Sequence, residues 1–492
     1  MRSPKDGCSP QGQCGCCTVW VDGAPRVACV TPARRVAGRT VTTVDGLDPG
    51  VRDRWADAFT AAGASQCGFC TPGIIMRLAG LEQRGPVSAE ATSSALLAHL
   101  CRCTGWRTIL EAAELATGAG SGPAASRHQR DLEAAAHRAG LEGRTHQLVG
   151  AVVALGGGGF SDDSAPPDAL VAVPDPAGGW VVGESLSEAR ARAGKVQGRH
   201  STLEVSWPVT VPEGDWALRL ATTWVEPGYL ETDASWCVPG GEPATPLANG
   251  GAFGGKVASV APAVARSLAD EHGRPVRVLL SREDVVRLGP KRPPLAAGVR
   301  EDGTGIVRVV RTDGIAAAIR SVAPGLVVEE VDAPGPPTSA AARAAGWAEA
   351  AVLLGVLDAR RRGSGTVTVR SADVAEAEAE VDDAGVRVRV GCGAPLDPVV
   401  LRSYCVGAAH MALGWVRSEA IAVDGAGLVH DLTIRSFGIL RAKDTPGIEV
   451  DVAEGDGEPV NGSDAVFAAV AGAAWLAAGL PERWPCARVA PR

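Results

Sequence analysis

The sequence of 492 residues is poor in aromatic side chains, in methionine and in dense blocks of positive charge. Aromatic residues make up 4% of it and include two tyrosines, so Ala, Gly and Val supply most of the apolar content. The formal net charge is -8. Without a Lys/Arg block, this acidic balance argues against a nucleic-acid-binding protein. The length is sufficient for three or four domains of an ordinary globular protein.

Long apolar runs are also missing. The longest apolar stretch, Val466 to Leu480, is rich in Ala and Gly and too short to span a bilayer comfortably. The first residues, Met1 to Asp6, lead directly into a cysteine loop and have none of the features of a signal peptide. We therefore expect a cytoplasmic protein that does not contact a membrane.

Cysteine, in contrast, is plentiful and unevenly placed. The sequence has 13 cysteines, and nine of them precede residue 104. Such a cluster predicts disulfides in an oxidising compartment and metal binding in a reducing one. The spacing of these nine cysteines favours metal.

The first cysteine group combines a tight loop with a predicted hairpin. Glycines and a proline let the loop Gly7–Cys17 curl so that its sulfurs point inward. Strands at 18–21 and 26–30, joined by an Asp-Gly turn, would bring Cys29 back beside this loop. Zinc would also accept four thiolates, but a glycine-rich loop followed by a hairpin favours an iron–sulfur cluster. The predicted ligands are Cys8, Cys14, Cys17 and Cys29, with Cys16 as a fifth thiol in the loop.

The second cysteine group lies at the turns of predicted helices. Helices are expected at 51–62, at 71–81 with Thr71 as N-cap, at 88–100 with Ser88 as N-cap, and from about Trp106 onwards. A C-x-x-C pair follows the first helix and a C-x-C pair follows the third. Two helical hairpins that meet at these turns would hold one cluster among four thiolates. These ligands are Cys67, Cys70, Cys101 and Cys103.

These motifs, with Gln66–Gly73 and Leu100–Trp106, resemble the iron–sulfur part of the xanthine oxidase (molybdenum hydroxylase) family. The resemblance implies one [2Fe-2S] cluster in a β-grasp ferredoxin domain and a second in a four-helix domain closer to the molybdopterin. It also implies that Gln66 contacts the pterin. About forty residues precede the first cysteine in that family and seven do so here, so we expect a shortened first domain with an open sheet edge.

Two glycine-rich stretches suggest nucleotide sites at first sight. No helix is expected directly after Gly156–Gly159, because Ser161–Pro167 follows, and a dinucleotide fingerprint is therefore rejected. The stretch Gly250–Lys256 nearly fits a P-loop, but Val257 stands where Mg²⁺ binding needs Ser or Thr. Its successive backbone N–H groups could still cradle an anion or a polar cofactor, or the stretch is a simple turn.

The family resemblance continues in the remaining chain, and three of its segments carry predicted site residues. Asn249–Lys256 is similar to a loop that lies against the molybdenum centre, which implies that Gly251, Phe253 and Gly254 contact the cofactor. The segment 343–346 faintly resembles an Arg-Gly-x-Gly stretch of the family, which implies that Arg343 also contacts the cofactor. The segment 457–459 resembles a Gly-Glu-Pro turn in which Glu458 would be the catalytic base. Judged from its acidic neighbours alone, Glu458 is equally an ordinary residue of a solvated loop.

The expected fold class is α+β, with a truncated β-grasp ferredoxin, a four-helix [2Fe-2S] domain and mixed α/β molybdopterin-binding-like domains. The expected boundaries are 1–46 for the ferredoxin, 47–117 for the four-helix domain, 118–248 for a linker and an α/β domain, and 249–492 for the molybdopterin-binding-like region. Residues 118–126 are the linker, because they are rich in Gly, Ala and Ser.

The function that the resemblance implies is that of a molybdenum hydroxylase related to xanthine and aldehyde dehydrogenases. It would oxidise a small organic substrate and pass electrons through two [2Fe-2S] clusters to a flavin-containing subunit or another acceptor, since the chain has no flavin domain. Two alternatives stay open: an electron-transfer or structural subunit with a degenerate molybdenum region, and a zinc-stabilised interaction protein. The sequence does not give the substrate. It does not give the oligomeric state either, and a homo-oligomer is one of the possible states.

Overall fold

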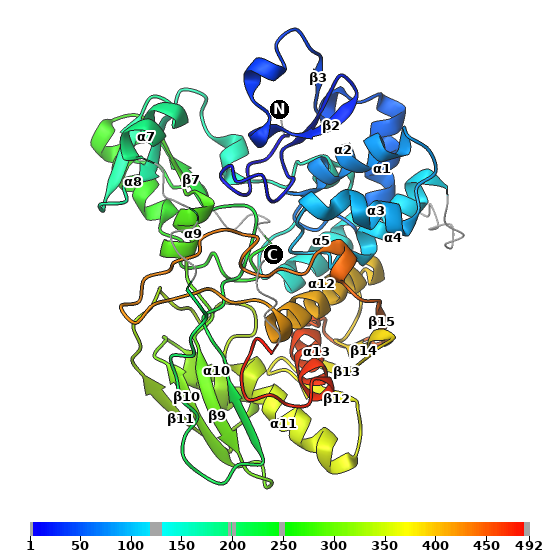
Figure 1. Cartoon of the computed structure of the whole chain (residues 1–492), viewed down its shortest axis with the longest axis vertical. Helices are drawn as coiled ribbons and strands as arrows, with labels where there is room; N and C mark the ends of the chain where they lie inside the picture. The colour runs from blue at the N-terminus through cyan, green and yellow to red at the C-terminus, as the bar shows by residue number, and fades with distance from the viewer. Residues whose placement is uncertain (1–2, 119–129, 195–197, 199–202, 246–250, 487–492) are drawn as a thin grey trace.

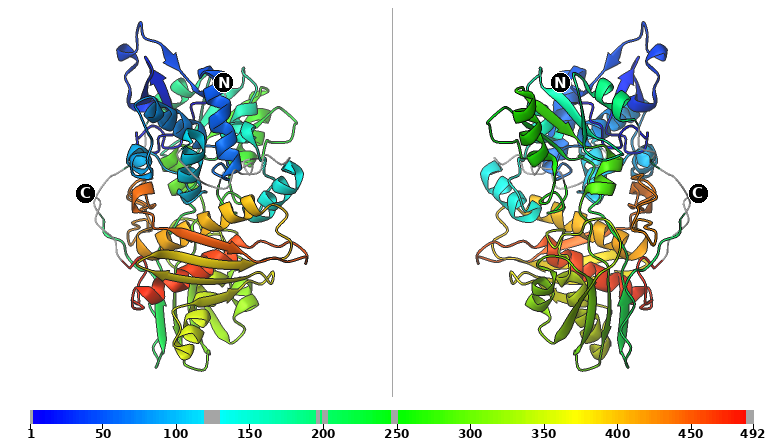
Figure 2. Two further views of the ribbon diagram at one scale, coloured as in Figure 1. Left: turned by 90° about the vertical axis from the view of Figure 1, so that its right-hand side faces the viewer. Right: turned by 90° about the vertical axis from the view of Figure 1, so that its left-hand side faces the viewer.

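The computed structural model describes residues 3–118, 130–194, 198, 203–245 and 251–486. In Figure 1 the blue N-terminal part of the chain lies at the upper end of the molecule, and the yellow part lies at the lower end. The predicted linker at 118–126 lies almost entirely outside the described residues. Figure 2 shows the same two-ended arrangement from the sides.

A small three-stranded sheet opens the chain. Its strands are β1 (Thr18–Val21), β2 (Ala24–Val27) and β3 (Val41–Thr42), in the order β2-β1-β3. The predicted hairpin is present, and Asp22 and Gly23 make its turn with φ angles of 49° and 74°. The second strand is shorter than predicted, because residues Ala28–Val30 form a 3₁₀ turn. Cys29 therefore lies just past the strand and not on it.

The helices that follow agree with the prediction in number and order. They are α1 (Pro49–Ala61), α2 (Thr71–Glu82), α3 (Ala89–Ala95) and α4 (Arg107–Thr117). Ser88 caps α3 as expected, but this helix ends five residues early and continues as a 3₁₀ turn, Leu96–Ala98. Helix α2 begins at Thr71, so Cys70 and not Thr71 is its N-cap residue. These differences of a few residues are typical of helix ends.

The next part of the chain begins with α5 (Leu132–Gly143) and the short α6 (Ala151–Ala154). A mixed sheet follows in the order β5-β4-β8-β7. Its strands are β4 (Leu170–Pro174), β5 (Trp180–Gly183), β7 (Ala234–Cys237) and β8 (Val276–Leu279), and its helices are α7 (Leu186–Ala193), α8 (Ala261–His272) and α9 (Arg282–Leu288). The expected domain boundary at 248/249 thus falls inside one sheet unit, between β7 and β8. Ser281 and Asp284 form a capping box at the start of α9.

The third sheet has the order β11-β10-β9-β6. Its strands are β6 (Leu218–Ala221), β9 (Leu295–Val299), β10 (Gly305–Val310) and β11 (Leu326–Val331). Helices α10 (Ile315–Val322) and α11 (Trp347–Arg362) pack against each other beside it. Strand β6 precedes residue 248 and pairs with β9, so this sheet also joins the two predicted regions.

The fourth sheet, β12-β13-β14-β15, and two long helices form the C-terminal core. Its strands are β12 (Val367–Arg370), β13 (Glu376–Asp382), β14 (Gly385–Gly391) and β15 (Ile448–Val452), and the helices are α12 (Pro398–Arg417) and α13 (Ser463–Ala477). The alternation of β13 buries its alanines and its valine and exposes its acids, which is typical of a strand covered on one face. Trp415 stacks on Phe467 between the two helices at 5.0 Å.

Helix α12 is the central element of the structure. It contacts α4 and α5 on one side and α13 and β15 on the other, as its position in Figure 1 shows. Among the described residues it is the one helix long and apolar enough to cross a membrane. In its most apolar stretch of 18 residues, 89% is buried inside the protein. The apolar composition of α12 is therefore explained by its place in the core.

Candidate iron–sulfur and cofactor site

The four thiols of the first predicted site lie together. The Cys8 sulfur is within hydrogen-bonding distance of the Cys14 and Cys29 thiols, and Cys17 of the Cys29 thiol. The backbone N–H of Gln11 donates to Cys8 Sγ at 3.3 Å and that of Cys29 to Cys17 Sγ at 3.5 Å. Backbone donors aimed at sulfur stabilise thiolates, and hydrogen bonds of this kind are one factor that sets cluster potentials. The loop and the hairpin thus converge as the sequence predicts.

The four thiols of the second site form two pairs. Cys67 and Cys103 have their sulfur atoms 3.6 Å apart, and Cys70 is hydrogen-bonded to Cys101. Two thiolates on one tetrahedral metal with bonds of about 2.3 Å lie roughly 3.8 Å apart, so Cys67 and Cys103 have the spacing of ligands to one metal ion. Among the described residues, no three His, Cys, Asp or Glu side chains surround a single ion site. Pairs without a third ligand suit a diiron cluster better than a single zinc ion.

The protonation of the paired thiols follows from their contacts. The hydrogen bond from Cys14 lowers the pKa of Cys8 to about 2, and that from Cys70 lowers the pKa of Cys101 to about 6. The pKa of Cys14 is raised by its hydrogen bonds with Cys16 and with Cys8, and the pKa of Cys70 is raised by its hydrogen bond with Cys101. Each quartet therefore contains a thiol whose pKa is lowered, Cys8 in the first and Cys101 in the second, which favours the thiolate form that binds iron.

Two further buried groups lie between the quartets. Cys16 is fully buried, and its thiol is hydrogen-bonded to the thiol of Cys14. Thr18 Oγ1 lies 3.1 Å from His99 Nε2. Burial lowers the pKa of His99 to about 3, so this imidazole is neutral. A side chain at Gly15 would collide with the His99 ring at 2.4 Å, which explains the glycine in the loop.

A pocket adjoins the second quartet directly. It encloses about 450 Å³ of space between protein atoms, part of it open to solvent, and Cys67 and Cys103 are in its wall. The predicted residues Gln66, Gly251, Phe253 and Gly254 line it. The structure therefore brings together four of the five predicted cofactor contacts. Other lining residues that carry polar groups are Arg144, Thr145, Gln147, Lys256 and Tyr404.

Gln66 is held in a fixed orientation at this pocket. Its side-chain nitrogen donates to the Cys103 carbonyl at 3.0 Å and to Ser403 Oγ at 2.9 Å. Its Oε1 atom is buried without a hydrogen-bond partner among the described residues. An unpaired buried acceptor costs free energy unless a ligand or a water donates to it. This atom is the clearest sign of a bound molecule in the pocket.

The glycine-rich segment after residue 250 lies against the second quartet. A Cβ atom at Gly251 would come within 2.5 Å of Cys103 Sγ, and one at Gly254 within 1.9 Å of the Ala341 carbonyl. Both positions have positive φ, of 66° and 90°, which glycine adopts without strain. These glycines let the backbone reach the sulfur atoms, as the resemblance implies. Asn249 and Gly250 lie outside the described residues.

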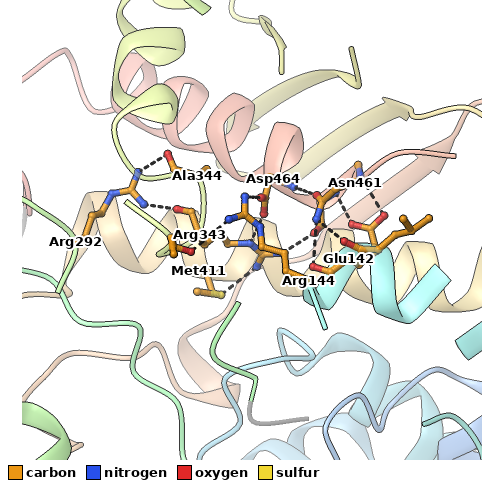
Figure 3. Close-up of polar contacts among 12 residues, drawn as sticks. Glu142, Arg144, Arg292, Arg343, Ala344, Met411, Asn461 and Asp464 are labelled. Atoms are coloured by element: carbon orange, nitrogen blue, oxygen red, sulfur yellow. Dashed lines mark hydrogen bonds and ion pairs between the residues drawn. The ribbon is translucent and has the colours of Figure 1, made fainter. Parts of the chain in front are cut away.

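Arg343, the fifth predicted contact, is buried one layer behind Phe253. Its guanidinium lies over the Phe253 ring at 4.0 Å. Its Nε donates to Asp464 Oδ1 at 2.8 Å and one terminal nitrogen donates to Ser463 Oγ at 2.6 Å (Figure 3). It therefore braces the Phe253 segment against the start of α13, and it does not line the pocket itself.

The sequence reasoning missed the polar partners around Arg343. Arg144, just past α5, pairs with the other oxygen of Asp464 (Figure 3). Burial would raise the pKa of Asp464, but the two guanidinium groups outweigh it and keep that pKa lowered. Glu142 accepts from the backbone N–H of Gly462 and Ser463 at 3.1 and 2.8 Å. The periodicity of α5 gives no hint of these roles, because they depend on segments more than 300 residues away.

Tyr404 is another lining residue that sequence reasoning missed. It lies in α12, is 3% exposed and meets the Phe253 ring edge-on at 6.1 Å. A signal was available, because Tyr404 is one of two tyrosines in the chain and interrupts an apolar helix.

Glu458, the predicted base, lies elsewhere. It is exposed in the loop between β15 and α13, and it is not among the residues that line the pocket. Its backbone packs on Gly393, where an added Cβ would come within 2.1 Å of the Glu458 carbonyl. The structure thus does not join Glu458 to Gln66 and Phe253, and its catalytic role stays a prediction.

Comparison with known proteins identifies a domain in the first quarter of the chain. Residues 43–114 match the family model of the [2Fe-2S] binding domain. The chain is 42% identical over 109 residues to the nicotine 6-hydroxylase small subunit of Paenarthrobacter nicotinovorans. The aligned segment is 22% of this chain and 66% of that protein. It is 37% identical over 114 residues to the xanthine dehydrogenase iron-sulfur-binding subunit of Escherichia coli O157:H7, 22% of this chain and 71% of that subunit.

The chain belongs to the xanthine dehydrogenase family. The chain spans about two thirds of the length of these small subunits. The [2Fe-2S] binding domain at 43–114 contains the second quartet described above.

The remainder is recognised by fold. The aldehyde oxidoreductase of Desulfovibrio gigas aligns with 96% of this chain and 93% of its own, with a TM-score of 0.69 and 13% identity. That of Desulfovibrio desulfuricans gives the same TM-score at 14% identity. These structures confirm the predicted α+β fold class and the mixed α/β character of the later regions.

The pocket suits a molybdenum–pterin cofactor in its chemistry. Gln66 offers an unpaired acceptor, Gln147 a further amide, and Arg144 and Lys256 N–H donors for anionic groups, although each of the two is also paired with a carboxylate. The close approach of Gly251 to Cys103 would bring such a cofactor next to the second cluster. Among the described residues, however, no Asp or Glu lines this pocket, so it offers no carboxylate base.

Proposed function

We propose that the protein is an oxidoreductase of the molybdenum hydroxylase type that oxidises a small organic molecule and passes the electrons through two [2Fe-2S] clusters. The observation that carries this proposal is the pocket whose wall contains both Gln66 and the cluster ligands Cys67 and Cys103. When bound there, a molybdenum–pterin cofactor would supply two-electron oxidation chemistry. The clusters would then accept the electrons one at a time.

The described residues would bind and orient that cofactor. Gln66 Nε2 is fixed by the Cys103 carbonyl, so Gln66 Oε1 is free to accept a hydrogen bond from a pterin N–H. Lys256 pairs with Glu231 at 2.9 Å and still faces the pocket, where it would attract anionic groups. Arg343 fixes the Phe253 segment, which excludes water from that side.

The electron acceptor would be a flavin-containing subunit or another redox protein. Cys29 is partly exposed, whereas the second quartet is buried, so the first cluster is the one nearer the surface. The relatives in the comparison are small subunits of larger enzymes, which fits a chain that works with other subunits. A cytoplasmic location, where free thiols persist, is part of this proposal.

A second candidate function is that of an electron-transfer or structural subunit without a molybdenum centre. The position of Glu458 and the lack of a carboxylate among the described lining residues favour it.

Metal and pterin analysis separates the two. About four iron atoms, one molybdenum and one pterin per chain would support the hydroxylase, whereas iron alone in a well-folded preparation would support the carrier. Zinc without iron would contradict both. In a molybdenum-containing preparation with turnover, Glu458→Gln tests the predicted base: unchanged turnover would exclude Glu458.

A further inference from the structure

Arg102 lies between two ligands of the second cluster and is itself buried. It separates Cys101 from Cys103 in the sequence and is 3% exposed. Its Nη2 donates to Glu419 Oε2 at 2.8 Å, and its Nη1 donates to the other carboxylate oxygen. Its Nε donates to the Pro227 carbonyl at 2.8 Å. The guanidinium is thus fully engaged, and one buried carboxylate faces it.

Glu419 reaches this position from the C-terminal region. It follows the end of α12, and its backbone N–H donates to the Gly414 carbonyl at 2.8 Å. A Cβ atom at Gly414 would lie 2.2 Å from Glu419 Oε1, so the glycine leaves the space that the carboxylate occupies. Glu419 is fully buried. The arrangement is therefore a built contact between the cluster loop and a segment more than 300 residues away.

The other charges around this pair have partners of their own. Arg292 pairs with Glu349, Arg282 with Glu226, and Arg343 with Asp464. His410 of α12 is buried, and its pKa is lowered to about 4, so it carries no charge at neutral pH. Glu419 is therefore the group that compensates the charge of Arg102.

The charge beside a cluster affects its reduction. Reduction adds one negative charge to a [2Fe-2S] cluster, so a nearby positive charge raises the reduction potential and a negative charge lowers it. The effect is strong where both charges are buried and poorly screened. We propose that Glu419, by offsetting the charge of Arg102, sets the reduction potential of the second cluster. Glu419 is thus a positioning and tuning residue, through which the C-terminal region acts on the cluster.

The test uses the full-length protein with its clusters and compares charge variants. A potentiometric titration followed by paramagnetic resonance gives a midpoint for each cluster. Glu419→Gln leaves Arg102 uncompensated, so the midpoint of the second cluster rises. Arg102→Gln leaves the carboxylate, so that midpoint falls. The double variant restores a value near that of the native protein. The midpoint of the first cluster, with different ligands, stays unchanged in all three.

The chain offers a matched control in the Arg402–Glu111 pair. It also joins the four-helix part to α12 with two hydrogen bonds, of 2.7 and 2.8 Å, but its side chains are 35% and 39% exposed. Glu111→Gln removes a carboxylate from the same interface at a position where solvent screens its charge. We expect both midpoints to stay unchanged in this variant.

Opposite shifts distinguish tuning from loss of structure. A merely structural role would make Glu419→Gln and Arg102→Gln act alike, by loss of iron or by shifts of the same sign, and either result overturns the proposal. If the Arg102→Gln variant loses its iron, Arg102→Lys replaces it in the test. This variant keeps the positive charge opposite Glu419, so the midpoint of its second cluster should stay near the native value. A midpoint as high as that of Glu419→Gln would contradict the proposal. The measurement needs iron and not molybdenum, so a protein without molybdenum would refute the hydroxylase function and leave this test intact.

Discussion

The two cysteine quartets are built in different ways. The first takes all its ligands from residues 8–29, and its Cys29 is partly exposed. The second is buried, and segments distant in sequence close over it: Gly251 approaches Cys103 Sγ, Gly407 of α12 approaches the Cys103 carbonyl, and Gly68 approaches Val153. A local loop suffices to gather four thiols, whereas enclosing them requires the remainder of the fold.

The largest expected effect is the selective loss of one cluster. Cys103→Ser removes a ligand of the second quartet and leaves the first loop untouched, because the two sites share no ligand. The iron content falls from about four to about two atoms per chain, and one paramagnetic signal disappears. Cys8→Ser is the matched variant and removes the other signal. Loss of both signals in either variant would show that the quartets do not form independently.

A smaller but still large effect is expected where α12 meets the second quartet. A side chain at Gly407 would lie 1.7 Å from the Cys103 carbonyl oxygen, so Gly407→Ala forces the helix and the cluster loop apart. Such overpacking costs about 1–3 kcal/mol of folding free energy. The melting temperature and the signal of the second cluster decrease, while the first cluster is retained. Gly425→Ala, where an added Cβ meets nothing within 4 Å, is the control and leaves both unchanged.

Metal removal sharpens the comparison further. An iron chelator under mildly oxidising conditions reaches the first cluster sooner, because Cys29 is partly exposed and the second quartet is covered. We expect the signal of the first cluster to decay several-fold faster, as followed by freeze-quenched paramagnetic resonance. Equal decay rates would indicate that opening of the whole molecule, and not local exposure, controls the loss.

The smallest expected effect is a pH dependence of stability near the second quartet. Burial lowers the pKa of His410 to about 4, from a usual value near 6.5. The unfolded chain binds this proton more readily, so the contribution of neutral His410 is complete above about pH 6.5 and is lost as the pH falls toward 4. The difference in stability between pH 7.5 and pH 5.5 is about 1 kcal/mol for this group. His410→Gln removes that part of the slope in thermal melts at the two pH values, and an unchanged slope would contradict the assignment.

The sequence predicted the parts that depend on neighbouring residues. Cysteine spacing, an Asp-Gly turn and the cap at Ser88 give the quartets, the hairpin and a helix start, because each is decided within a few residues. The prediction was less accurate where an element ends: the third helix stops at Ala95, and Cys29 follows a strand that ends at Val27. Ends depend on what packs against them, which local patterns do not report.

The candidate pocket shows the same limit. Gln66, Gly251, Phe253 and Gly254 were predicted by resemblance and line it, whereas Glu458 matches a motif and lies exposed in a loop. Arg144 carries no local signal of a site, and the rarity of Tyr404 in the chain does not tell which residues it meets. Their role depends on α5 and α12 meeting the glycine-rich segment.

By itself, the sequence determined that eight thiols form two metal-binding groups, because ligand spacing, turn chemistry and helix caps are local properties. Only the tertiary structure decided what surrounds them: the closure of the second quartet by Gly251 and Gly407, the pairing of Arg102 with Glu419, and the distance of Glu458 from the pocket. The physical reason is that burial and charge compensation arise between segments hundreds of residues apart, and their geometry exists once the chain has packed.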